Sequence, residues 1–106
     1  MSDVWIERFQ KEALPRIGHK FKLAKVMIFG SRITGGATET SDLDVIIVSV
    51  DFGKIPFVKR MGELLRTARF PKHVDYFCYT PEEFDRVKKS STIIEEAVQQ
   101  GIEVKM

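Results

Sequence analysis

The sequence predicts a single-domain α/β or α+β protein in which helices pack on one β-sheet. Its 106 residues suit one domain spanning residues 1–106, large enough to bury a core. Short apolar runs of strand length alternate along the chain with segments of helical periodicity. The run Val45–Val48 is apolar at every position, which predicts a central strand buried on both faces.

The N-terminal part predicts a helix followed by a strand. Apolar side chains recur near helical spacing over residues 4–17, with Ser2 or Asp3 as the N-cap. Pro15 falls late in this run and is expected to kink or end the helix, because proline lacks an amide hydrogen. Residues 23–29 then form a short apolar strand.

The middle of the chain predicts a loop, two strands and a helix. Residues 31–40 are rich in glycine and threonine and are expected to form a loop with one helical turn. Residues 42–50 form the second strand, and residues 57–68 show the spacing of an amphipathic helix. Residues 73–79 form a third strand, in which alternate side chains face opposite sides of the sheet.

The C-terminal part begins with a capping box. Thr80 is the expected N-cap, Pro81 takes the first helical position, and Glu83 closes the box. A second helix is predicted over residues 92–100, and residues 102–104 are expected to add a short last strand.

Composition narrows the class of protein. The chain is 43% hydrophobic and 30% charged, as in soluble globular proteins, and its net charge of +2 argues against a dedicated nucleic-acid-binding domain. No apolar run is long enough to span a membrane, and the polar start is not a secretory signal. Cys78 is the one cysteine, so no internal disulfide and no cysteine-built zinc site can form, and a cytoplasmic location is expected.

Basic residues gather between the second and third strands. Lys59, Arg60, Arg66 and Arg69 lie in or directly after the predicted helix. They form either a solvated helix face or a docking surface for phosphate or an acidic partner protein.

The candidate functional residues start at the first strand's end. Gly30 and Ser31 form a turn whose backbone N–H groups and hydroxyl can bind phosphate, and Arg32 can clamp phosphate or fold back onto a carboxylate. Asp42 and Asp44 point to the same side of the second strand, with Cα atoms roughly 6.5–7 Å apart. Two such carboxylates repel each other when bare and converge naturally on one or two hard cations such as Mg²⁺.

Asp75 supplies a third carboxylate in the middle of the third strand. If this strand neighbours the second, the three aspartates meet on one face and can hold two metal ions. Alternatively, Asp75 is a strand-edge residue bonded to a neighbouring turn. His73 is expected to be a surface histidine rather than a base.

These residues resemble the signature of the DNA polymerase β-type nucleotidyltransferase superfamily. The likeness rests on Phe29–Arg32, Gly35, Ser41–Val45 and Val74–Tyr76, and the chain's short length is similar to that of the minimal nucleotidyltransferases. Many minimal members carry a further arginine where this chain has Thr34.

The resemblance implies a mixed sheet flanked by helices and a definite chemistry. Gly30 and Ser31, with Arg32, would bind the nucleotide, while Asp42, Asp44 and Asp75 would be catalytic residues and metal ligands. It implies two Mg²⁺ ions and ATP, with AMP transferred and pyrophosphate released.

The resemblance also implies a partner. Many minimal members are antitoxins encoded beside a HEPN-type RNase toxin. Because the chain has no room for an acceptor-binding domain, a hydroxyl of a partner protein is the leading acceptor. Two hypotheses follow: an enzyme that adenylylates its partner, or a catalytically silent, nucleotide-binding antitoxin that occludes it. A Rossmann-like sensor is disfavoured because residues 30–35 lack the middle glycine of the Gly-x-Gly-x-x-Gly turn.

Overall fold

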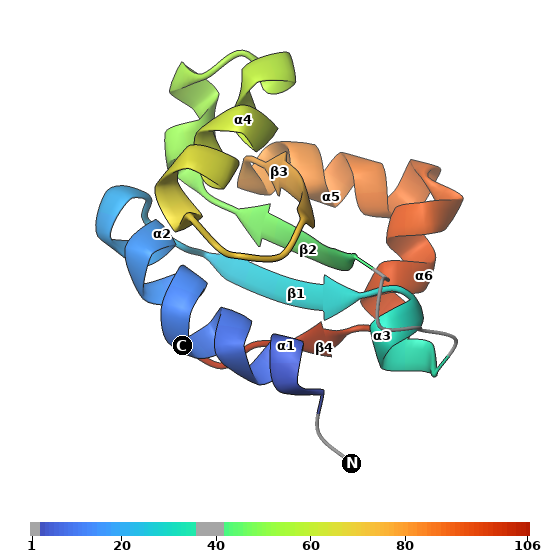
Figure 1. The fold of residues 1–106 in the computed structure, drawn as a ribbon. Coiled ribbons are helices and arrows are strands. Elements are labelled where there is room, and N and C mark those ends of the chain that lie inside the picture. The colour runs from blue at the N-terminus through green and yellow to red at the C-terminus, as the bar shows by residue number, and fades with distance from the viewer. Residues whose placement is uncertain (1–2, 36–41) are drawn as a thin grey trace.

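The computed structural model describes residues 3–35 and 42–106, and these contain a four-stranded mixed sheet (Figure 1). Its strand order is β3-β2-β1-β4. The strands are β1 (Lys25–Phe29), β2 (Leu43–Val48), β3 (Val74–Tyr79) and β4 (Ile102–Glu103). β1 pairs antiparallel with β2 and β4, whereas β2 and β3 run parallel. Helices flank this sheet, which confirms the predicted fold class.

β2 lies between β1 and β3, as its continuous apolar run predicts. Because β2 and β3 are parallel, their first residues meet at the same edge of the sheet. The register places Leu43 opposite Val74 and Asp44 opposite Asp75. The two strands therefore bring their acidic residues together.

The N-terminal helical run differs from its predicted length. It comprises α1 (Val4–Arg8), a π-helical turn η1 (Phe9–Ala13) and α2 (Leu14–Lys20), so it continues past residue 17. The Leu14 amide bonds to the Phe9 carbonyl, five residues back, directly before Pro15. This wider turn accommodates a residue that can donate no hydrogen bond, and Pro15 lies in the first turn of α2. Asp3 is the N-cap and accepts from the Trp5 amide at 2.8 Å.

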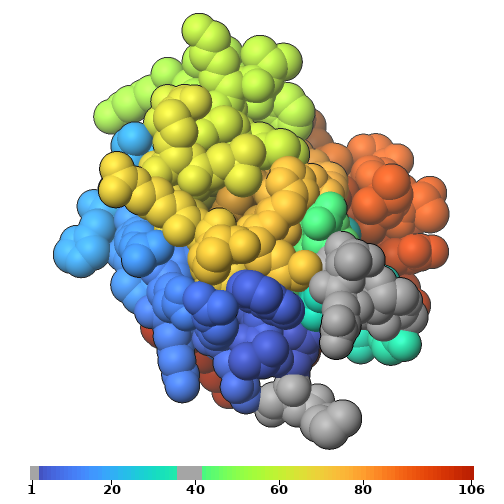
Figure 2. Space-filling view, viewed as in Figure 1, coloured from blue at the N-terminus to red at the C-terminus, as the bar shows by residue number. Residues whose placement is uncertain are grey.

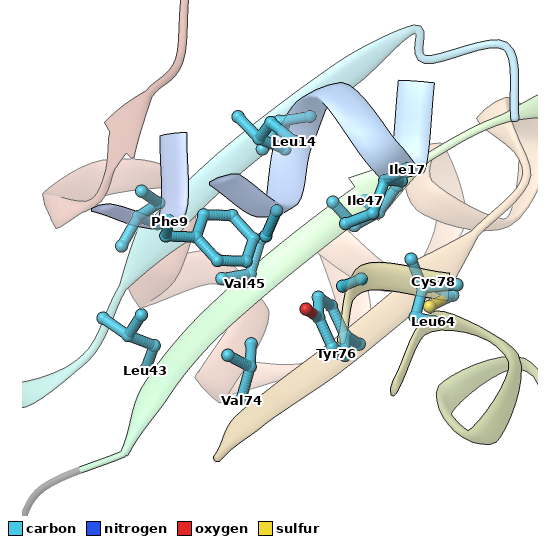
Figure 3. Packing of buried hydrophobic residues seen from close by; sticks show 14 of the residues in the cluster. Phe9, Leu14, Ile17, Leu43, Val45, Ile47, Leu64, Val74, Tyr76 and Cys78 are labelled. Carbon is cyan, nitrogen blue, oxygen red and sulfur yellow. The ribbon is translucent and has the colours of Figure 1, made fainter. Parts of the chain in front are cut away.

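One face of the sheet is closed by the N-terminal helices and by α4 (Phe57–Ala68). Figure 3 shows side chains of these helices packed on alternate residues of β2 and β3. The labelled residues are Phe9, Leu14, Ile17, Leu43, Val45, Ile47, Leu64, Val74, Tyr76 and Cys78. Burial raises the pKa of the Cys78 thiol to about 12, as befits a core residue.

The opposite face carries α5 (Pro81–Ser90) and α6 (Thr92–Gln100). The predicted capping box is present: the Thr80 amide donates to Glu83 Oε1 at 2.8 Å, and the Glu83 amide donates to Thr80 Oγ1 at 3.3 Å. A smaller apolar cluster lies under these helices; it contains Met27, Phe29, Ile46, Val48, Tyr79, Phe84, Ile94 and Ala97. Within residues 3–35 and 42–106, no helix has both the length and the apolar character needed to cross a bilayer.

A 3-10 turn, η2 (Val50–Lys54), connects β2 to α4, which has the predicted bounds. Part of its apolar face is nevertheless uncovered, with Phe57 57% and Val58 87% exposed. Arg60 is instead buried, and its guanidinium bonds to Glu83, to the Ile55 carbonyl at 3.0 Å and to the Cys78 carbonyl at 3.2 Å. The prediction that Arg60 belongs to a basic docking surface was therefore wrong, because the buried Arg60 side chain ties α4 to β3 and α5.

Replacing Arg60 with methionine should destabilise the fold. Hydrogen bonds to charged groups contribute about 1.5–3 kcal/mol each, so we expect the free energy of unfolding to fall by at least that much. The control Arg66→Met removes an exposed pair with Glu63 and should cost less than about 1 kcal/mol.

The Arg60 effect should also depend on pH. The hydrogen bond from Arg60 lowers the pKa of Glu83 below its ordinary 4.5. The stabilisation that the Arg60–Glu83 pair provides is therefore fully present above pH 4.5 and is lost as pH falls through the lowered pKa of Glu83. Urea unfolding should show that the difference in unfolding free energy between wild type and Arg60→Met narrows as pH falls below 4.5. An equal difference at every pH would contradict this role.

Candidate functional site

The three predicted aspartates lie at the edge where β2 and β3 begin. Asp44 and Asp75 are directly opposite each other, and Asp42 immediately precedes β2. Figure 2 shows the starts of β2 (green) and β3 (gold) side by side at the surface. Asp75 lies on the edge strand β3 and contacts His73 just before that strand, so the structure shows both the strand-edge contact considered for Asp75 and its position opposite Asp44.

Asp44 is the most constrained of the three. Burial raises the pKa of its carboxyl group, and the negative charges of Asp75 and Asp42 raise it further. Among the described residues, no group donates a hydrogen bond to this carboxylate. An ionised, half-buried carboxylate facing two other acids is unfavourable alone, so the arrangement fits a bound cation.

Gly30 makes room for Asp44. Its φ of 90° and ψ of −163° lie in a region that is essentially restricted to glycine. A Cβ atom at this position would overlap the Asp44 carboxylate. The sequence predicted Gly30 to be a phosphate-binding residue, and the structure adds a steric reason for glycine at this position.

Ser31 opens onto a pocket beside the acids. It begins α3 (Ser31–Thr34), the single helical turn predicted in this loop. Within the described part of the chain, neither its amide nor its hydroxyl donates a hydrogen bond. The pocket has a volume of about 310 Å³, and its walls come from the end of β1, from α3 and from α6. They comprise Phe29, Gly30, Ser31, Thr34, Ile93, Glu96, Ala97 and Gln100.

Arg32 was expected to contact either a phosphate or a carboxylate, and in the structure it contacts a carboxylate. Its side chain is 6% exposed and donates to Asp3 Oδ2 at 2.7 Å. Asp3 also caps α1, so this ion pair ties the turn after β1 to the N-terminal helix. A phosphate group would have to share or replace this contact for the predicted nucleotide role of Arg32 to hold.

His73 is the site residue that the sequence analysis did not select. Its imidazole Nε2 lies 2.9 Å from Asp75 Oδ1, while its side chain remains 52% exposed. Ligand atoms of Asp42, His73 and Asp75 all lie within 4.8 Å of one another. The period of two in an extended chain sends positions 73 and 75 to the same side, and this signal could have identified His73.

The comparisons with known proteins agree with this geometry. The family model described as nucleotidyltransferase domain matches residues 10–100. The chain belongs to the nucleotidyltransferase domain family.

The fold is also similar to a solved structure. A crystal structure of a protein from Sulfolobus solfataricus, named as a putative nucleotidyltransferase, superposes with a TM-score of 0.60 at 27% sequence identity. The match covers 97% of this chain and 87% of that one. No curated protein matches the sequence at a significant level.

A nucleotidyltransferase domain has nucleotidyl transfer as its general chemistry and a nucleotide as its substrate. Domains of this family usually use a divalent metal ion. The donor set fits one, since carboxylate oxygens are the ligands that hard divalent ions prefer.

Two glycine variants separate backbone strain from crowding of Asp44. Both Gly30 and Gly35 have positive φ, but among the described residues nothing lies within 4 Å of a Cβ built on Gly35. Gly35→Ala should therefore cost only the strain of a left-handed residue, roughly 1–2 kcal/mol, and leave Mn²⁺ affinity unchanged. Gly30→Ala should also displace Asp44 and weaken Mn²⁺ binding about tenfold or more in a calorimetric titration. Equal Mn²⁺ affinity in the two variants would contradict the steric role.

Asp44→Asn should raise the melting temperature of the metal-free protein. The amide removes a charge that burial and two neighbouring acids disfavour while nearly preserving side-chain volume. Each kcal/mol gained in stability corresponds to a rise of roughly 4–8 °C in the melting temperature of a domain of this size. The same variant should lose the stabilisation that Mg²⁺ gives wild type in differential scanning fluorimetry. A lower melting temperature without metal would contradict the repulsion.

Proposed function

We propose that residues 1–106 form one nucleotidyltransferase domain that transfers AMP from ATP to a hydroxyl group of a partner protein, using divalent metal. The observation that carries the proposal is the pairing of Asp44 with Asp75 across β2 and β3, with Asp42 beside them. Three acids at one sheet edge are costly to a fold unless they serve a cation. The proposed location is the reducing cytoplasm, and the buried, unpaired thiol of Cys78 supports that proposal.

The proposed roles follow from where each side chain lies. Asp44 on β2 and Asp42 just before it hold the metal ions, and Asp75 on β3 completes the set. When bound, two Mg²⁺ ions stabilise the charge on the attacking and leaving oxygens of an in-line phosphoryl transfer. Gly30 keeps Asp44 in place while approaching the nucleotide closely through its backbone.

The proposed reaction forms one bond and breaks another at the α-phosphorus of ATP. The acceptor oxygen bonds to phosphorus, and the bond to the departing pyrophosphate breaks. Asp75 is the proposed acceptor of the hydroxyl proton, because it is 39% exposed and thus reachable by an acceptor arriving from solvent.

The nucleotide is proposed to lie in the pocket between α3 and α6. Its volume of about 310 Å³ is at the lower end of the roughly 300–1,000 Å³ typical of ligand pockets. Ser31 lines it, and its amide and hydroxyl, which donate to no other described residue, can donate to phosphate oxygens. The side chains of Glu96 and Gln100 on α6 supply polar groups for the ribose or base.

A protein acceptor is favoured by the uncovered surface of α4. Its large apolar side chains are unusually exposed for a helix that packs on a core; they are Phe57, Val58, Met61 and Leu65. Lys59, Arg66 and Arg69 are exposed near them, so the surface suits a partner with acidic and apolar groups. By resemblance, the proposed partner is a HEPN-type toxin, and the domain is its antitoxin.

The same surface keeps a second function open. An antitoxin that acts by occlusion needs only the α4 surface and no chemistry at the acids. The paired acids favour catalysis, because occlusion gives no reason to place three carboxylates together.

Label transfer tests the proposed function directly. The protein, Mg²⁺ and α-phosphate-labelled ATP are incubated with a lysate of the native host or with the product of the neighbouring gene. We expect a labelled protein with wild type and none with Asp44→Asn, which weakens metal binding at nearly constant volume. The control Asp51→Asn changes an aspartate away from the site and should leave labelling intact.

The alternative makes the opposite prediction. Absence of label in a preparation shown to bind its partner would overturn the enzyme and favour occlusion. Label on nucleic acid instead of protein would keep nucleotidyl transfer and overturn the proposed acceptor.

A further inference from the structure

The acid cluster contains a nitrogen atom that the proposed function does not use. His73 directly precedes β3, and its Nε2 lies 2.9 Å from Asp75 Oδ1. With one carboxylate oxygen of Asp42, these atoms lie within 4.8 Å of one another. All three side chains reach the surface, so an ion from solvent can approach them.

The spacing of these atoms suits ligands of one ion. Octahedral bonds of about 2.1 Å place adjacent ligands about 3.0 Å apart and opposite ligands about 4.2 Å apart. The His73–Asp75 spacing matches adjacent ligands, and the spread of 4.8 Å closes onto an ion with small side-chain movements. A neutral imidazole has a lone pair to direct at a metal.

The identity of the donors then bears on which ion binds. Mg²⁺ strongly prefers oxygen ligands and keeps several waters, whereas imidazole is a better ligand for transition metals. Mn²⁺ accepts carboxylates and water as Mg²⁺ does, and it also accepts nitrogen. A site with two carboxylates and one imidazole therefore differs in selectivity from a site built from carboxylates alone.

We propose that His73 is a direct ligand, with Asp42 and Asp75, of one divalent ion, and that its nitrogen makes this position favour Mn²⁺ over Mg²⁺. The inference rests on the proposed function, because this ion belongs to the nucleotidyl-transfer site. Asp44 lies outside this group of three and holds its carboxylate against Gly30. The nitrogen-containing position is thus on the Asp75 side of the cluster, where an acceptor hydroxyl arrives.

The contact between His73 and Asp75 also permits a simpler arrangement. His73 could donate a hydrogen bond to Asp75 and orient that carboxylate without touching an ion. A test must therefore detect nitrogen on the metal, since loss of activity would follow in either case.

Pulsed electron paramagnetic resonance of Mn²⁺ bound to the full chain provides that test. Electron spin echo envelope modulation of wild type should show ¹⁴N coupling from a bound imidazole. The coupling should vanish in His73→Gln, with Mn²⁺ still bound, and persist in the matched control His19→Gln. These are the two histidines of the chain, and both are exposed, so neither substitution should alter folding.

Affinities give an independent readout. Removing a direct ligand should weaken Mn²⁺ binding about tenfold or more in His73→Gln, because even loss of an indirect partner typically costs 10–100-fold. Mg²⁺ affinity, measured by competition with Mn²⁺, should change by less than about threefold, because Mg²⁺ gains little from imidazole.

The outcomes separate this inference from the proposed function. Bound Mn²⁺ without ¹⁴N coupling in wild type overturns the role of His73 as a ligand, while label transfer with Mg²⁺ would still stand. Equal weakening of Mn²⁺ and Mg²⁺ in His73→Gln also overturns it and assigns His73 to positioning Asp75. Mn²⁺ binding that survives simultaneous replacement of Asp42 and Asp75 by asparagine would overturn both.

Discussion

The parallel pairing of β2 with β3 is the constraint on which the rest of the site depends. It places Asp44 opposite Asp75 and brings Asp42 and His73, the residues just before each strand, to the same edge. Burial raises the pKa of the Asp44 carboxyl group, and the negative charges of Asp75 and Asp42 raise it further, so ionising Asp44 opposes folding. The large apolar core on the opposite face of these strands supplies the stability that offsets this electrostatic cost. The site is therefore strained by charge and supported by packing.

The two faces of the sheet carry cores of different size. The face under α1, α2 and α4 holds the larger core, whereas the face under α5 and α6 has a smaller core beside the acids. Two ion pairs fasten surrounding segments: Arg60 with Glu83 joins α4 to α5, and Arg32 with Asp3 joins the turn after β1 to α1. The side chains of Arg32 and Arg60 are 6% and 5% exposed, so each ties two elements together rather than serving as a solvated charge.

Local patterns could be predicted from the sequence, and contacts between distant segments could not. The capping box at Thr80 and the central position of β2 follow from neighbouring residues alone. The Arg32–Asp3 pair joins positions 29 residues apart and depends on how α1 docks, which no local pattern encodes. Periodicity predicted α4 but not which part of its apolar face would be covered, and it gave no sign that Arg60 would be buried. Strand alternation places His73 on the same side of the chain as Asp75. The sequence does not show that Asp42 lies beside them, and without Asp42 a surface histidine gives little sign of a metal site.

The acids are proposed to hold metal ions against a nucleotide bound at the Gly30–Ser31 turn. A crystal structure with Mn²⁺ and an ATP analogue that cannot be cleaved between its α- and β-phosphates tests it most directly. We expect anomalous scattering peaks among Asp42, Asp44 and Asp75, with phosphates beside Ser31. The larger pocket between α2 and the last residues of the chain, of about 500 Å³, lies apart from these acids. A nucleotide bound in that larger pocket, with no metal at the aspartates, would contradict the proposed site.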